Sequence, residues 1–161
     1  MYKKIICFVL LIFFVSVCMS ADTPNQSGNE ENIRKILIVS DGSRFKVKVV
    51  EQLFEYSSSQ SLDFTVVDVE NALNINLAEY ERYIFLCKMK GGKVDEDTYN
   101  FYQTITDKNK ILIGLTHFFN MPMPELAKQN TAGIDVVTSA SKNRNVNHFS
   151  KEIFDWINAG N

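Results

Sequence analysis

The chain alternates short apolar runs of β-forming residues with longer segments of helical periodicity, and this alternation limits its possible folds more than any other feature. Strands that alternate with helices form a parallel sheet covered by crossover helices. Strands buried on both faces are largely apolar, as these runs are. The five predicted strands are Ile36–Val39, Phe64–Val67, Tyr83–Leu86, Ile111–Leu115 and Ile134–Val137. The sequence therefore predicts an α/β domain with a five-stranded parallel sheet.

The segments between these strands carry apolar residues at helical spacing. In the first, Arg44–Tyr56, the pairs Val49 with Leu53 and Val50 with Phe54 are each four residues apart. The segment Asn71–Tyr80 is either a short helix or a turn. The remaining predicted helices are Val94–Ile105, a short helix after Pro124, and Val146–Ile157.

Residues 1–20 have the three parts of a secretory signal. Lys3 and Lys4 make the start basic, Ile5–Val15 is an unbroken apolar run, and small residues follow up to Ala21. The run is shorter than the roughly 20 apolar residues of a membrane-spanning helix. We therefore expect residues 1–20 to be a cleaved signal peptide, with an uncleaved signal anchor and a buried helix as alternatives.

The residues after the signal predict how the domain is tethered. Residues 21–33 are polar and rich in turn-forming residues, so they are predicted to be a flexible linker before a domain of residues 34–161. The segment Val15–Cys18 is similar to a relaxed bacterial lipobox, which makes Cys18 a candidate lipid attachment site. The expected location is therefore outside the cytoplasm, either periplasmic or anchored to a membrane through Cys18 or an uncleaved signal.

Cysteine and charge counts narrow the function further. Of the three cysteines only Cys87 follows the signal, so the exported domain would have no internal disulfide. Without Lys3 and Lys4, 15 of the 17 basic residues remain against 19 acidic residues, a net charge of −4. This balance argues against nucleic acid as a partner, because phosphate binding requires a basic surface.

The order of the elements, together with the segments Lys35–Val39 and Tyr80–Leu86, resembles the flavodoxin family over roughly residues 34–158. The resemblance implies a flavodoxin-like three-layer sandwich with the strand order 2-1-3-4-5. In such folds the ligand lies beyond the carboxyl ends of the strands, where the strand order reverses. The resemblance also implies FMN as the cofactor and a redox partner protein.

The first loop, Ser40–Lys46, stands where flavodoxins bind the phosphate of FMN. Backbone N–H groups and hydroxyls at a helix N-terminus favour an anion. Asp41 and Phe45 depart from the family pattern S/T-x-T-G-x-T, and the Asp41 carboxylate would repel phosphate. A helix cap and a chain turn are the alternative role of this loop. The candidate phosphate contacts are Ser40, Gly42, Ser43 and Arg44, with Lys46 as an alternative cation.

Two further loops, Cys87–Lys93 and Thr116–Met121, stand where this family places residues beside the flavin ring. A glycine pair lets backbone approach a planar ring, methionine packs on it, and aromatic side chains stack against it. For the loop after the third strand, the alternative is a solvated basic loop. For the loop after the fourth strand, the alternative is that His117 has a structural role. The candidate ring contacts are Met89, Gly91, Gly92, Thr116, Phe118 and Phe119.

The run Asp135–Ser141 resembles the D-x-x-[ST]-[GS]-A-[ST] pattern of exported FMN-binding domains, in which the last hydroxyl carries FMN through a phosphoester bond. The resemblance implies Ser141 as the acceptor and Asp135 as a residue that assists the attaching transferase. Ser141 stands where threonine is usual, and Asn143 replaces an expected hydroxyl residue. An ordinary loop between the last strand and the last helix is the alternative.

Two functions follow from these features. The first is an extracytoplasmic flavodoxin-like electron carrier, in which the redox chemistry belongs to FMN. The second is a flavodoxin-like binding or accessory module that has lost its cofactor. Asp41 and Phe45 favour the second function, whereas Ser43, Arg44 and the pair Phe118–Phe119 favour the first. The sequence indicates no catalytic residues, since it has no G-x-S-x-G motif and no metal-ligand cluster.

Overall fold

The computed structural model describes residues 33–90, 93–117, 134–140 and 145–159, which all belong to one unit, Asn32–Asn161. The predicted signal peptide and the linker up to residue 32 lie outside the described residues, as does the short helix predicted after Pro124. Within the described part, no helix combines the length and the apolar character needed to cross a bilayer.

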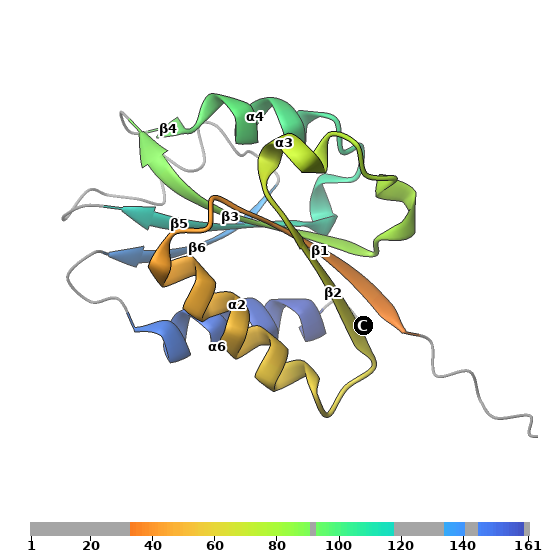
Figure 1. Ribbon diagram of the computed structural model, residues 1–161, viewed down its shortest axis with the longest axis vertical. Helices are drawn as coiled ribbons and strands as arrows, with labels where there is room; N and C mark the ends of the chain where they lie inside the picture. Colours follow the sequence, from red (N-terminus) through yellow and green to blue (C-terminus); the bar gives the residue numbers. More distant parts are fainter. Residues whose placement is uncertain (1–32, 91–92, 118–133, 141–144, 160–161) are drawn as a thin grey trace, which may run out of the picture. The chain divides into compact units, whose positions relative to one another are not determined.

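Five parallel strands form the centre of the domain (Figure 1). When these five parallel strands are numbered one to five along the chain, their order across the sheet is 2-1-3-4-5, which confirms the predicted order. A two-residue strand, β4 (Lys93–Val94), pairs antiparallel with the end of β3, and no sequence pattern indicated it. In spatial order the five strands are β2 (Leu62–Val67), β1 (Arg34–Ser40), β3 (Arg82–Lys90), β5 (Ile111–His117) and β6 (Asp135–Ala140).

Helices cover both faces of this sheet (Figure 1). Helices α2 (Arg44–Ser57) and α6 (Val146–Ala159) lie on one face, and α3 (Val69–Ala72) and α4 (Glu96–Gln103) lie on the other. Strand β1 shows why both faces are covered, because Ile36 and Ile38 join one apolar core and Leu37 and Val39 join the other. All four side chains are at most 2% exposed. The three-layer arrangement implied by the flavodoxin resemblance is therefore present.

The helix after β4 begins later than predicted. Val94 belongs to β4, and α4 starts at Glu96 because Asp95 caps it, with the Asp95 carboxylate accepting a hydrogen bond from the Thr98 N–H at 3.0 Å. Apolar spacing alone does not mark a helix start, whereas a capping carboxylate does. The segment Asn71–Tyr80, left open between helix and turn, contains the end of α3 and a 3₁₀ turn, η1 (Leu77–Glu79). A second 3₁₀ turn, η2 (Lys108–Lys110), precedes β5.

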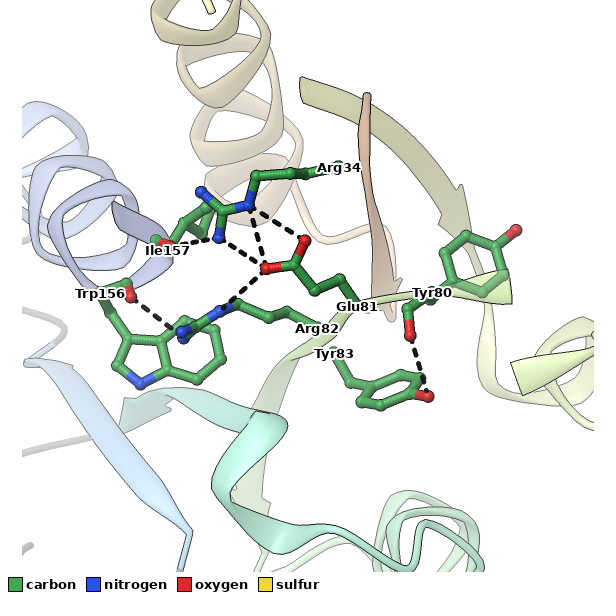
Figure 2. A network of polar contacts seen from close by, with 7 residues as sticks. All are labelled: Arg34, Tyr80, Glu81, Arg82, Tyr83, Trp156 and Ile157. Carbon is green, nitrogen blue, oxygen red and sulfur yellow. Dashed lines mark hydrogen bonds and ion pairs between the residues drawn. The ribbon is translucent and has the colours of Figure 1, made fainter. Parts of the chain in front are cut away.

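A polar network fastens the end of α6 to the amino ends of β1 and β3 (Figure 2). Arg34 donates to the Ile157 carbonyl at 2.7 Å and Arg82 to the Trp156 carbonyl at 3.2 Å. Glu81 accepts from Arg34 Nε at 3.0 Å, and the Arg82 guanidinium lies 4.5 Å from the Trp156 ring centroid. Cations at a helix C-terminus satisfy its last carbonyls and oppose its dipole. The network thus stabilises the sheet end opposite to the predicted ligand site.

Candidate functional site

The carboxyl ends of β1 and β3 lie side by side where the strand order reverses, with Ser40 paired to Leu86 in the last register position. A crevice of about 440 Å³ opens at this point, between β3 and the chain segments that follow β1, β2 and β4. This is the place at which a sheet of this topology presents a ligand site. Its polar lining comprises Ser40, Asp41, Asp68, Glu70, Lys88, Asp95, Asp97 and Thr98.

The crevice is acidic. Its described lining contains five carboxylates and a single cation, Lys88. Two of the carboxylates are fixed by helix starts, since Asp68 accepts from the Asn71 N–H at 2.8 Å and Asp95 from the Thr98 N–H. A cleft lined by one sign of charge attracts the opposite sign and repels its own. The crevice therefore disfavours a phosphate group and favours a cationic one.

The loop after β1 uses its own side chains to satisfy its backbone. The Gly42 N–H donates to Ser40 Oγ at 3.3 Å, and the Ser43 N–H donates to Asp41 Oδ1 at 3.1 Å. Gly42 has a φ of +68°, a conformation that glycine adopts without steric cost. Three predicted phosphate contacts, Ser40, Gly42 and Ser43, thus lie together in this loop, but the Gly42 N–H is bound to Ser40 and the Ser43 N–H to the Asp41 carboxylate. The fourth, Arg44, is exposed at the first position of α2.

The other oxygen of Asp41 binds a buried lysine. Lys46 Nζ lies 2.7 Å from Asp41 Oδ2, and the Lys46 side chain is only 1% exposed. Burial opposes ionisation of Asp41, but the hydrogen bonds from Lys46 and Ser43 and the positive charge of Lys46 outweigh it and lower the pKa of Asp41 below its ordinary value. Asp41 is therefore an anion that the loop holds with one backbone donor and one ammonium group.

This loop does not fit the phosphate of FMN. A phosphate would need the Ser43 N–H and a nearby cation, and both are already bound to Asp41 at hydrogen-bonding distance. The phosphate would have to displace a carboxylate and then lie close to its negative charge, which is unfavourable. Asp41 and Phe45, the two residues that depart from the family pattern, therefore have other roles. Asp41 is the anion inside the loop, and Phe45 is an apolar core residue that is 8% exposed.

Two of the remaining predicted contacts, Met89 and Thr116, lie near the same end of the sheet. Met89 is half-buried, pairs with Val94 and packs against the core on the α4 side. Thr116 is 7% exposed and donates from Oγ1 to the Cys87 carbonyl at 3.5 Å. Both side chains therefore contribute to the fold. Gly91, Gly92, Phe118, Phe119 and Ser141 lie outside the described residues.

Cys87 is a buried thiol at the base of the crevice. Its side chain is 3% exposed, and this burial raises the pKa of the thiol, although the nearby charge of Lys46 partly opposes the rise. A thiol with a raised pKa and little exposure is unreactive. Among the described residues no group of three or more histidine, cysteine, aspartate or glutamate side chains is placed to hold a metal ion.

Asp135, the first residue of β6, holds the last helix to the sheet. Trp156 Nε1 donates to Asp135 Oδ2 at 2.6 Å. Because Asp135 begins β6 and Ala140 ends it, five residue steps of extended strand separate them, or about 16 Å. Asp135 thus lies at the opposite end of β6 from Ala140.

Sequence reasoning missed the acidic crevice and the buried position of Lys46. The signal for the crevice was present, since Asp68 and Glu70 directly follow the second strand and Asp95 and Asp97 follow the third strand and its glycine pair. The signal for Lys46 was weaker. It lies on a helix whose other lysine, Lys48, is exposed, and only the helical spacing separates the two. Lys46 shares the face of Val49, Val50 and Leu53, whereas Lys48 shares the face of Glu51, Gln52 and Glu55.

The comparisons with known proteins address the fold. No family model and no curated protein matches the chain. Among solved structures it is similar to a metal-soaked Flv1 flavodiiron core from Synechocystis sp. PCC6803, with a TM-score of 0.59 and 12% identity over 81% of this chain. The fold is flavodoxin-like. The chain spans 36% of the length of that protein, and at this identity the likeness shows the fold alone.

Proposed function

We propose that this chain is an extracytoplasmic, flavodoxin-like binding or accessory module that has lost its FMN site. The observation that carries this proposal is the ion pair between Asp41 and Lys46, which fills the phosphate loop with an anion of the protein's own. The five carboxylates of the crevice support it, since they repel a second anion. The ion pair and the acidic crevice fit a module that recognises a partner molecule other than FMN.

The alternative is the electron carrier, with FMN bound in the strand-end loops or attached covalently at Ser141. It is favoured by the fold and by the sequence features Ser43, Arg44, Phe118–Phe119 and Asp135–Ser141, but a fold alone does not establish activity. Binding of FMN in the first loop would also require the Ser43 N–H and Lys46 to release the Asp41 carboxylate and bind phosphate in its place.

Flavin content tests the two functions directly. The full chain, co-expressed with an FMN transferase and purified, is expected to be colourless and to leave the fluorescence of added FMN unquenched. Visible absorbance typical of flavin would overturn the proposal. Absorbance that stays with the denatured chain and is lost in Ser141→Ala would indicate covalent attachment instead.

A matched variant tests why the loop excludes phosphate. Asp41→Thr removes the internal anion, supplies a hydroxyl and leaves Lys46 without its carboxylate. We expect this variant to bind inorganic phosphate more tightly than the parent chain, as measured by the phosphate dependence of its thermal stability. The control is Asp63→Thr, which removes an exposed carboxylate from β2 outside the loop and should not change phosphate binding. Equal phosphate dependence in all three proteins would contradict the role of Asp41.

The extracytoplasmic location is tested separately. Mass spectrometry of the chain recovered from the periplasm of an expressing bacterium should show loss of residues 1–20. A mass increase by a diacylglyceryl group that disappears in Cys18→Ala would instead assign the lipid anchor. An intact chain recovered from the cytosol would contradict export.

A further inference from the structure

Strand β2 forms an edge of the sheet. Among the described strands it pairs only with β1, so the side of β2 away from β1 carries peptide groups that no described strand pairs. An edge strand of this kind can accept an added strand from another chain through main-chain hydrogen bonds. The edge alone does not say which chain.

A groove of about 560 Å³ runs beside this edge, between α2 and β2. Val47, Phe54 and Val66 are 43%, 46% and 41% exposed, although most large apolar side chains of the domain are buried. The Phe54 ring is held against the Phe64 ring in an edge-to-face contact with centroids 5.5 Å apart. Clustered exposed apolar side chains mark a binding surface. The apolar floor of the groove consists of Val47, Val50, Phe54, Val66 and Val67.

The rim of the groove has a single sign of charge. Asp41, Glu51 and Asp68 line it, and no cationic side chain is among its described lining residues; because Asp41 is paired with buried Lys46, Glu51 and Asp68 carry the unpaired negative charge of the rim. Asp41 and Asp68 also line the acidic crevice, so the two hollows share one negative border. An occupant must therefore be apolar where it meets the floor and cationic where it meets the rim.

The charges also select among the possible occupants. A second copy of this chain that paired through its own β2 would bring the segment Leu62–Val67, which contains one aspartate and no basic residue, so it would add no cation to the groove. An anionic membrane surface would be repelled by the acidic rim. A basic segment of a different protein meets neither obstacle.

We propose that this groove binds an extended segment of a partner protein in which apolar and basic residues alternate, and that the segment adds to the sheet as a strand beside β2. Alternate side chains of a strand point to opposite sides. One set therefore faces α2 and enters the apolar floor beside Glu51, and the other set faces the side of α3, where Asp68 caps the start of that helix. The inference rests on the proposed function and names the class of partner that the module recognises.

The probe is a fluorescent peptide of alternating lysine and valine, about eight residues long, which is within the usual length of a strand. We expect the full chain to bind this peptide in an anisotropy titration and to bind a matched glutamate and valine peptide at least roughly tenfold more weakly, with affinity for the first falling as salt rises. Two further versions carry N-methyl groups on alternate residues. Since only one side of an added strand pairs with β2, one version should lose binding and the other should keep it.

Variants of the protein locate the site. Val66→Lys places a cation on the apolar floor, and Glu51→Lys reverses the charge of an exposed rim residue without touching the core. Each should weaken binding of the lysine and valine peptide by roughly tenfold. The control is Tyr99→Lys, which adds one positive charge, as Val66→Lys does, at a 38% exposed position on α4, on the opposite face of the sheet, and should change the affinity much less.

Several results would overturn the inference: no binding of the lysine and valine peptide, equal binding of both peptides, equal effects of Glu51→Lys and Tyr99→Lys, or a dimer in sedimentation that Val66→Lys dissociates. The proposed function fails on a different measurement, flavin absorbance of the same purified chain. A colourless protein that ignores the peptide would therefore leave the loss of FMN standing and remove only the partner.

Discussion

Lys46 Nζ lies 2.7 Å from Asp41 Oδ2, and the lysine side chain is 1% exposed whereas that of the aspartate is 34% exposed. The pair thus joins a buried cation to an anion that faces the crevice. A buried ammonium is tolerated only when it is paired, because desolvation of a lone charge is costly. Asp41 therefore stabilises the fold and also occupies the Ser43 N–H and the Lys46 ammonium, which a phosphate would need.

The first prediction concerns the loss of this pairing. Asp41→Asn removes the charge that neutralises buried Lys46, so it should lower the free energy of unfolding by about 3 kcal/mol. The double variant Asp41→Asn with Lys46→Met removes both charges and should recover part of that loss. Urea unfolding measures each value. The control Lys48→Met, at an exposed position of the same helix, should change stability by about 0.5 kcal/mol or less.

The second prediction concerns pH. The pKa of Asp41 is lowered in the folded protein, so the unfolded chain binds this proton at a higher pH than the folded chain does. The stabilisation is therefore complete above the unfolded pKa of about 3.9 and is lost as the pH falls through the folded pKa. The stability difference between the parent chain and Asp41→Asn should stay constant near neutral pH and shrink below about pH 4. A difference that is unchanged down to pH 2 would contradict this assignment.

The third prediction concerns the packing of α6 on the sheet. A Cβ atom at Gly114 would lie 2.8 Å from Leu86 Cδ2 and 3.1 Å from Phe149 Cζ, both closer than side chains normally approach. Gly114→Ala should destabilise the protein by about 1 to 3 kcal/mol. Adding Leu86→Val removes the nearest methyl group and should restore part of this loss, which thermal unfolding of both variants measures.

The matched control for Gly114 is Gly42. Its φ is +68° and nothing lies within 4 Å of the position of an added Cβ, so Gly42→Ala tests backbone strain without a steric clash. We expect a loss of about 1 to 2 kcal/mol that Leu86→Val does not relieve. Relief of both glycine variants by Leu86→Val would show that its effect is not local to Gly114.

The sequence was sufficient for the sheet because its strands depend on local composition. Runs such as Ile36–Val39 are apolar on both sides, and each predicted strand overlaps an observed one. The site depends on distances that composition does not encode. The sequence shows Asp41 and Lys46 five residues apart in a loop and a helix start, but only the folded turn at Gly42 brings their side chains to 2.7 Å. An internal ion pair and a phosphate cradle therefore look alike in sequence.

The fourth prediction concerns Cys87. Because burial raises the pKa of its thiol and leaves it 3% exposed, it should not react with Ellman's reagent in the folded protein. The measurement uses a chain with Cys7→Ser and Cys18→Ser, so that Cys87 is the single thiol. Reaction should become complete in guanidinium chloride. Rapid reaction of the folded chain would mean that the crevice opens to expose the sulfur.

The last prediction concerns the network at the opposite end of the sheet (Figure 2). Arg34→Gln removes the charged donor that reaches the Ile157 carbonyl at 2.7 Å and binds Glu81, so it should cost about 1.5 to 3 kcal/mol. Lys151→Gln is the control, since its pair with Asp155 is solvent-exposed and surface pairs contribute about 0.5 kcal/mol. Amide hydrogen exchange should quicken in the last turn of α6 for the first variant only. Similar exchange in both would mean that apolar packing alone holds the helix end, and that the arginines are not its cap.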